Sequence, residues 1–591
     1  MFTDLSICRK EGRTLNCLPK TMKLHYTYDH YYLYDEMTAV LERYARDYPE
    51  YVRLTSLTAT AGGREMWILS LTDLSTGDYE EKPGLLIEGN IHADEIIGSM
   101  CILYYIDHLL SGKDEDPKIA RMLRDYTVYA IPRICPDGTE YAFTGDWTCK
   151  SNTRLYPFTS MPEGVIPKDL DGDGHVRKMR IRDPKGEWKI NPEDPRMFIH
   201  REPDDIDGEF YTVVMEGIVN GDIKTCLYDA PNPYTRNYNR NFPYLWRPDS
   251  HLNRIDQFGS GEYPMCDPEV KAIVDFTVSH SNLCSFVDFH SCLAMILAPE
   301  EIACTDHGDK KDEKRYAEII SMGQSVTGFN TNLKPGPKSG FVRLGGDSSN
   351  YMHFCRGIFA LGYEACGQRL EARLVRESNY KDKADNDIRM HKWLDDHGYG
   401  EDVFKPWTPF RHPQLGEVEI GGIEHKTIVM NPAEDMLLDE AEKAARFLDR
   451  IINTMPVLEM KEVTVNKLSG DIYAGNTYEV LATVANNRYL PTYVTEEAIS
   501  LNLISDIEIT LGGTVENVIV GERTMSLGQL DGTSNMCGGS MFGYASLMSG
   551  KKPDMEKTAR WVIKAQPGEE LMITAISKRA GIASGTVCIP E

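Results

Sequence analysis

Apolar positions along the first 455 residues switch repeatedly between a helical spacing and short continuous runs. Between residues 31 and 52, apolar side chains recur every three or four positions, which predicts an amphipathic helix. The runs 66–71 and 85–88 are short, as in buried strands. Further helices are expected at 96–110, 268–281 and 313–326, and further strands at 127–132, 285–290 and 357–363. This alternation predicts an α/β fold with a mixed central sheet flanked by helices.

Two segments interrupt that alternation. Residues 156–238 are rich in Asp, Pro and Gly and show little periodicity, so we interpret them as an insertion. After an amphipathic helix at 433–453, residues 456–591 alternate apolar and polar positions between turn signals, which predicts an antiparallel β-sandwich. We therefore expect a leader at 1–25, a main domain at 26–455 and an accessory sandwich at 456–591.

Charge and composition narrow the class of function. The chain has 591 residues and a net charge of −26, which argues against nucleic acid as a partner because phosphate binding needs clustered cations. No apolar run approaches the roughly 18 residues of a spanning helix, and the first residues lack a signal sequence. The 14 cysteines form no CxxC pair. A cytoplasmic protein without a membrane partner is the expectation.

A candidate metal site lies in the run LLIEGNIHADEIIGSM. His92 and Glu95 follow an apolar strand at the entry to a helix, and two residues three apart there can face one ion. His290 ends another apolar strand and would face the crevice at the sheet edge. Alternatively, His92 and Glu95 are two unrelated surface residues, and His290 is a hydrogen-bonded histidine of the core. Two nitrogens and one carboxylate oxygen would leave a fourth zinc position open.

Glu364 ends the apolar run GIFALGYE. A charge that emerges from a buried strand needs a partner or a chemical task, so Glu364 is a candidate general base. An exposed acid at a strand end is the alternative.

Five motifs in this order resemble the zinc metallocarboxypeptidases of the carboxypeptidase A type. They are His92-x-x-Glu95, CPDG at 135–138, NYNRNFP at 237–243, DFHS at 288–291, and Glu364. The resemblance covers residues 26–453. The Asp/Gly-rich segment DLDGDGHVRKMRIRDPKGEW and the later FRHPQLGEVEIGG resemble a large branch of that family with an insertion.

The resemblance implies one Zn²⁺ per chain, held by His92, Glu95 and His290, with Glu364 as general base for a zinc-activated water. A peptide substrate would lose its C-terminal residue, and no covalent intermediate is implied. Further roles are implied for five residues: Asn239 and Arg240 on the terminal carboxylate, Lys150 or Arg154 on the scissile carbonyl, and Tyr351 either closing over the substrate or only packing.

Three departures from the family pattern leave alternatives open. Asn237 stands where an aspartate usually supports a zinc-bound histidine, the usual closing tyrosine is missing, and the specificity position near Ser349 carries no charge. A zinc peptidase for isopeptides or cell-wall-type peptides is one alternative. A catalytically silent protein that binds peptide C-termini is another.

The insertion contains a candidate calcium loop. Asp169, Asp171 and Asp173 precede Gly174 as in the first half of an EF-hand, but the twelfth position is Arg180 rather than glutamate. An Asp/Gly-rich turn is the alternative interpretation. The sandwich shows no catalytic constellation, so packing against the main domain, or narrowing access to it, is its expected role.

Overall fold

The structure of the chain is a computed structural model. It describes residues 24–248, 258–334, 337–340, 344–366, 368–372, 380–423, 430–471, 475–515, 517–536 and 552–591. The expected leader lies outside these residues up to residue 23.

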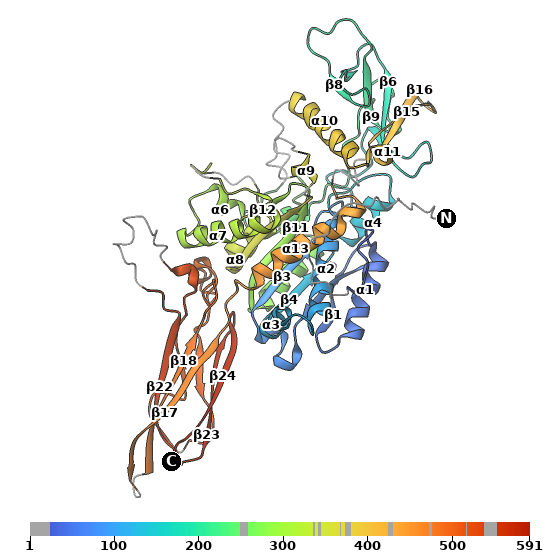
Figure 1. Cartoon of the computed structure of the whole chain (residues 1–591). Coiled ribbons are helices and arrows are strands. Elements are labelled where there is room, and N and C mark those ends of the chain that lie inside the picture. The colour runs from blue at the N-terminus through green and yellow to red at the C-terminus, as the bar shows by residue number, and fades with distance from the viewer. Residues whose placement is uncertain are drawn as a thin grey trace.

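An eight-stranded mixed sheet forms the centre of the main domain, in the order β1-β2-β4-β3-β11-β14-β12-β13 (Figure 1). The four middle strands β4, β3, β11 and β14 are parallel. β2 pairs antiparallel with β4, β1 pairs antiparallel with β2, and β12 pairs antiparallel with β14. The predicted mixed sheet is confirmed. In chain order, the strands are β1 (Val52–Ala59), β2 (Glu65–Leu71), β3 (Gly84–Gly89), β4 (Thr127–Ile131), β11 (Leu283–Ser291), β12 (Met295–Leu297), β13 (Asn330–Thr331) and β14 (Phe359–Ala365).

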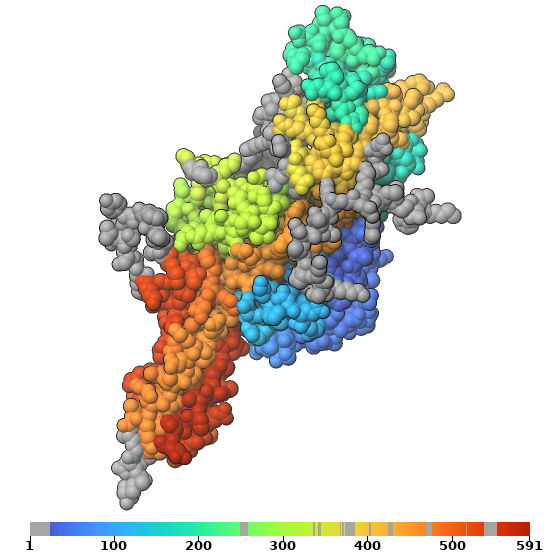
Figure 2. All heavy atoms as spheres, in the orientation of Figure 1, coloured from blue at the N-terminus to red at the C-terminus, as the bar shows by residue number. Residues whose placement is uncertain are grey.

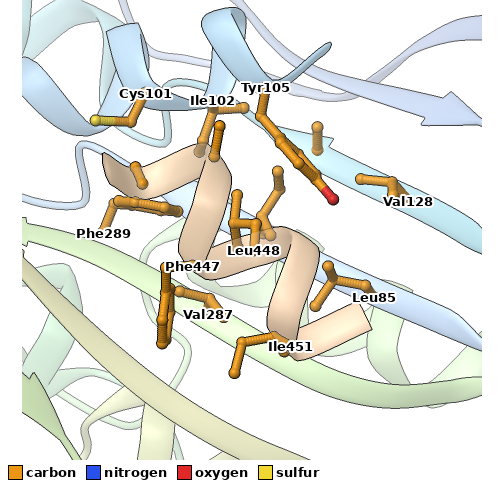
Figure 3. Close-up of a cluster of buried hydrophobic side chains, with 14 of the residues drawn as sticks. Leu85, Cys101, Ile102, Tyr105, Val128, Val287, Phe289, Phe447, Leu448 and Ile451 are labelled. Carbon is orange, nitrogen blue, oxygen red and sulfur yellow. The ribbon is translucent and has the colours of Figure 1, made fainter. Parts of the chain in front are cut away.

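Helices cover both faces of this sheet. On one face, α2 packs on β3 and β11, and α13 packs against α2 and α7. Figure 3 shows Phe447, Leu448 and Ile451 of α13 in the same apolar cluster as Val287 and Phe289 of β11. Apolar residues of α4, α5 and α8 share a second core with the other face. The helices of the main domain are α1 (Tyr34–Asp47), α2 (Ile97–Gly112), α3 (Pro117–Asp125), α4 (Pro136–Thr144), α5 (Pro268–Ser279), α6 (Glu300–Cys304), α7 (Lys310–Thr327), α8 (Ser348–Arg356) and α13 (Leu437–Ile452).

The aperiodic insertion contributes to a second, smaller sheet. Its strands pair with a hairpin from residues 404–423 in the order β15-β16-β6-β9-β7-β8, which we call the insertion sheet (Figure 1). Its strands are β6 (Lys178–Arg182), β7 (Trp188–Ile190), β8 (Phe198–His200), β9 (Tyr211–Met215), β15 (Phe404–His412) and β16 (Gly416–Ile423), and a separate pair is formed by β5 (Gly164–Pro167) and β10 (Gly217–Asn220). Helices α9 (Gln368–Glu371), α10 (Tyr380–Asp396) and α11 (Gly400–Val403) precede the hairpin.

The C-terminal strands form two antiparallel four-stranded sheets, in the orders β17-β18-β22-β20 and β21-β19-β23-β24. Their inner faces share one apolar core around the fully buried Trp561, as predicted for a sandwich. In Figure 2 this sandwich extends away from the main domain. Its elements are β17 (Glu459–Asp471), β18 (Gly475–Ala485), α14 (Glu496–Ser500), β19 (Glu508–Leu511), β20 (Asn517–Val520), β21 (Thr524–Ser526), β22 (Glu556–Lys564), β23 (Glu570–Ser577) and β24 (Gly581–Cys588).

Among the helices that the structure describes, none combines the length and the apolar composition needed to cross a bilayer.

Candidate metal centre

The site lies where three parallel strands end at the same edge of the central sheet. β3 ends at Gly89, β11 at Ser291 and β14 at Ala365. Between β3 and α2 the chain turns sharply at Asn90, which has a φ of 58°. The Asn90 side chain stabilises this turn by donating a 2.6 Å hydrogen bond to the carbonyl oxygen of His92. The parallel topology and this turn bring groups from distant parts of the sequence to one point.

His92, Glu95 and His290 converge on that point. Nδ1 of His92 lies 2.8 Å from one Glu95 carboxylate oxygen, and Nδ1 of His290 lies 3.0 Å from the other. Their candidate ligand atoms all lie within 4.8 Å of one another. The three residues are buried. Two imidazole nitrogens and one carboxylate in a small buried volume fit the donor set of a zinc site that keeps a position for water.

Electrostatics keep two of these ligands in the form that binds a metal. Burial lowers the pKa of His92 to about 4, so its imidazole is neutral. Burial alone would raise the pKa of Glu95, but His92, Lys150 and His290 outweigh it and hold the pKa well below its usual range. His290 behaves differently: Asp288 and Glu95 overcome the effect of burial and raise its pKa. A metal at this point would replace that proton.

Each histidine is oriented through its second nitrogen. Nε2 of His92 lies 3.2 Å from Oδ1 of Asn237, and Nε2 of His290 lies 2.9 Å from Oδ2 of Asp288. The hydroxyl of Ser348 donates to the same Asp288 oxygen at 2.6 Å. The neutral amide at Asn237 was predicted from the sequence, whereas the role of Asp288 was not. The signal was in the DFHS motif, because residues two apart on a strand share a face.

Glu364 is the neighbour of His290 across the β11–β14 pairing. Its Oε2 atom is buried and has no hydrogen-bond partner among the described residues. Burial raises the pKa of Glu364 to about 7. The carboxyl group is therefore poised to gain or lose a proton near neutral pH.

The two candidate cations lie in different surroundings. Nζ of Lys150 is 3.6 Å from Oε1 of Glu95, next to the metal ligands. Nη2 of Arg154 instead contacts both carboxylate oxygens of Glu262, at 2.9 and 3.0 Å. Its guanidinium is committed to an acid outside the ligand triad.

The three candidate substrate-binding residues also differ. The Asn239 amide nitrogen lies 3.2 Å from Nε2 of His290, and its oxygen accepts from the backbone N–H of Ser348 at 2.8 Å. Arg240 follows directly and is partly exposed. Tyr351 packs in the core, where its hydroxyl lies 3.3 Å from that of Thr277.

In the candidate calcium loop, the aspartate side chains contact backbone N–H groups and a lysine of the protein itself. Asp169 accepts hydrogen bonds from the backbone N–H groups of Gly172 and Gly174, at 2.7 and 2.9 Å. Nζ of Lys405 contacts both Asp171 and Asp173 at 2.6 Å. The Lys405 ammonium therefore neutralises Asp171 and Asp173. This arrangement is that of an Asp/Gly-rich turn and does not support a calcium site.

Comparisons with known proteins identify the main domain. Residues 37–327 match the family described as zinc carboxypeptidase, and residues 457–588 match a domain of unknown function. Carboxypeptidase D of Mus musculus is 30% identical over 118 residues, which are 20% of this chain and 8% of that protein. Carboxypeptidase A4 of Mus musculus is 23% identical over 267 residues, 45% of each protein.

A solved structure titled thrombin activatable fibrinolysis inhibitor aligns over 72% of this chain and 74% of its own, with 14% identity and a TM-score of 0.42. The sequence match spans less than half the length of either carboxypeptidase. Through the segment 37–327, which contains His92, Glu95 and His290, this chain belongs to the zinc carboxypeptidase family.

Proposed function

We propose that the protein is a zinc-dependent metallocarboxypeptidase that hydrolyses C-terminal peptide bonds. The observation that carries this proposal is the convergence of the His92 and His290 Nδ1 atoms on the two oxygens of Glu95. Zinc bound by these groups would supply a Lewis acid that polarises the scissile carbonyl and acidifies a water molecule. The family match of residues 37–327 supports the same chemistry.

Glu364 is the proposed general base. It stands beside His290 in the sheet, and its buried oxygen has no hydrogen-bond partner among the described residues. An ionised Glu364 can take a proton from the attacking water and then deliver it to the leaving amine. Because its pKa is raised to about 7, the carboxyl group can act in both directions near neutral pH.

Lys150 is the proposed cation for the scissile carbonyl. Its ammonium lies 3.6 Å from Glu95, whereas Arg154 is paired with Glu262. A lysine would stabilise the developing oxyanion as a point charge. Arg240, adjacent to the Asn239 that contacts His290, is the proposed binding group for the substrate's terminal carboxylate, a role that suits a guanidinium.

The test uses the purified full-length chain and a mixed peptide pool. We expect about one zinc per chain and release of single C-terminal residues, detected by mass spectrometry. A chelator should stop release, and added zinc should restore it. Glu364→Gln should keep zinc but lose roughly 100-fold or more of the activity. Unchanged activity in Glu364→Gln would refute the assigned base.

The same assay separates the alternatives. Branched or cell-wall-type peptides in a parallel pool would reveal a preference for isopeptide bonds. Tight peptide binding without turnover in zinc-loaded protein would favour the silent binding protein, an idea motivated by the neutral Asn237 and the packed Tyr351. The cytoplasmic location stays a prediction.

A further inference from the structure

Two carboxyl groups lie side by side beneath the metal centre. Glu88 of β3 is the register partner of Asp288 of β11, and both residues are 0% exposed. Register partners on adjacent parallel strands point their side chains to the same face of the sheet. Asp288 is also the residue whose Oδ2 atom orients His290.

Three oxygens of this pair have no hydrogen-bond partner among the described residues: both oxygens of Glu88 and Oδ1 of Asp288. An unpaired carboxylate in a buried site is costly, and two neighbouring buried carboxylates do not both ionise. Oδ2 of Asp288 already contacts His290 and Ser348, whereas neither oxygen of Glu88 has a partner among the described residues. The proton of the pair therefore belongs on Glu88.

The electrostatics agree with this assignment. Burial raises the pKa of Glu88 well above its usual range, and the Asp288 carboxylate raises it further, whereas His290 has a smaller opposite effect. A protonated Glu88 has one O–H donor. Of its register partners on the two neighbouring strands, Asp288 of β11 offers an acceptor and Ile131 of β4 does not.

We propose that Glu88 is a positioning residue of the metal centre, which as a neutral carboxylic acid donates a hydrogen bond to Oδ1 of Asp288. Asp288 is then held on both oxygens, by Glu88 on one and by Ser348 and His290 on the other. The imidazole of His290 is thereby fixed with Nδ1 toward Glu95, where the metal would bind. Glu88 contacts neither substrate nor metal in this role.

This inference rests on the proposed zinc site, but its test reads zinc affinity rather than peptide release. Dissociation constants for zinc are measured by competition with a chelator for the wild type and for Glu88→Gln, Glu88→Asp and Glu88→Leu. The amide of Gln still donates at the same reach, so affinity should stay within about twofold of wild type. Leu removes the donor and should weaken binding roughly 10-fold, and Asp, one methylene shorter, should fall between these two.

Even if Glu88→Leu does not fold, the Gln and Asp variants show whether residue 88 must donate a hydrogen bond or carry a negative charge. If Glu88 acted through a negative charge, Glu88→Asp would keep the zinc affinity of the wild type and Glu88→Gln would lose it. That result would overturn the proposal. Equal affinities in all four proteins would overturn it as well. Ser285→Ala is the matched control, because Ser285 is buried on β11 with an unpartnered hydroxyl but lies on the opposite face of the strand from Asp288.

A double mutant of Glu88 and Asp288 provides a second test, again measured as zinc affinity. Asp288→Asn should weaken zinc binding by roughly 10- to 100-fold, and Glu88→Leu added to it should have little further effect because the two residues act in series. Zinc binding without peptide release in the wild type would refute the proposed function and leave this inference standing. A wild type that binds no zinc would refute both.

Discussion

Nη1 of Arg579 in the sandwich donates a 2.7 Å hydrogen bond to the carbonyl oxygen of Gly357 in the main domain. Nη2 of the same guanidinium donates to the carbonyl of Arg356, also at 2.7 Å. These carbonyls end helix α8, where Gly357 adopts the left-handed conformation with a φ of 59°. The sandwich thus supplies the donors that the last turn of a main-domain helix needs. Helix α8 begins at Ser348, which contacts Asp288 below the metal ligands.

Arg579→Met should destabilise the protein by about 2 kcal/mol, because the carbonyl groups of Arg356 and Gly357 lose a charged donor. Burial lowers the pKa of Arg579 to about 10, so the wild-type side chain remains a cation at neutral pH. Thermal unfolding of the two proteins at the same pH measures the loss.

Arg560→Met is the matched control for this prediction. Arg560 lies in the same sandwich and pairs with Glu479, but its side chain is 55% exposed. Such surface pairs usually contribute less than about 1 kcal/mol. Equal unfolding midpoints for the two variants would contradict a special role for Arg579.

Lys150→Met should lower kcat by roughly 100- to 1,000-fold, the usual effect of removing one group that stabilises an oxyanion. Arg154→Met should leave kcat nearly unchanged, since Arg154 is paired with Glu262, which is not one of the three ligands. Kinetics on one peptide substrate, with the zinc content of each variant checked, separate the two cations. The reverse order of effects would assign the role to Arg154.

The inner strands β3, β4 and β11 of the central sheet were predictable from sequence because every residue in them is buried. The expected strand 285–290 lies within β11, in which all nine residues are buried, and such continuous apolar runs are distinctive. The insertion sheet was not predictable, because β7 and β8 have three residues each and β6 pairs with β16, more than 200 positions later in the chain. Strands this short carry almost no periodic signal.

The candidate site also has a part that the sequence predicts and a part that only the folded chain shows. His92, Glu95, His290 and Glu364 could be found because each stands at the end of an apolar strand or at a helix entry. The spacing of two residues places Asp288 on the same face of β11 as His290, but only the folded chain shows that its Oδ2 atom contacts Nε2 of His290. The sequence also left the choice between Lys150 and Arg154 open, since only the folded chain brings Glu262 to Arg154.

Asn237→Ala should weaken zinc binding by roughly 10-fold, because the Nε2 atom of His92 loses its acceptor. Asn237→Asp keeps the acceptor and adds the negative charge that makes an imidazole ligand more basic, so its affinity should equal or exceed that of the wild type. Chelator competition at one fixed pH compares the three proteins. If Asn237→Asp bound zinc more weakly than Asn237→Ala, the added charge would cost more than the hydrogen bond contributes.

The pH dependence of peptide release should follow the ionisation of Glu364. The base acts only when ionised, so kcat/KM should fall about tenfold per pH unit on the acid side of its pKa. Burial raises that pKa to about 7, and a cation bound by the triad would favour the ionised form, which places the midpoint at or below about 7.

Lys150 lowers the pKa of Glu364 through its charge, so Lys150→Met should move the midpoint to higher pH, whereas Arg154→Met should not. Zinc content is measured at each pH, so that loss of metal in acid is not mistaken for protonation of the base. A pH profile unchanged by Lys150→Met would show that the ammonium does not act on Glu364.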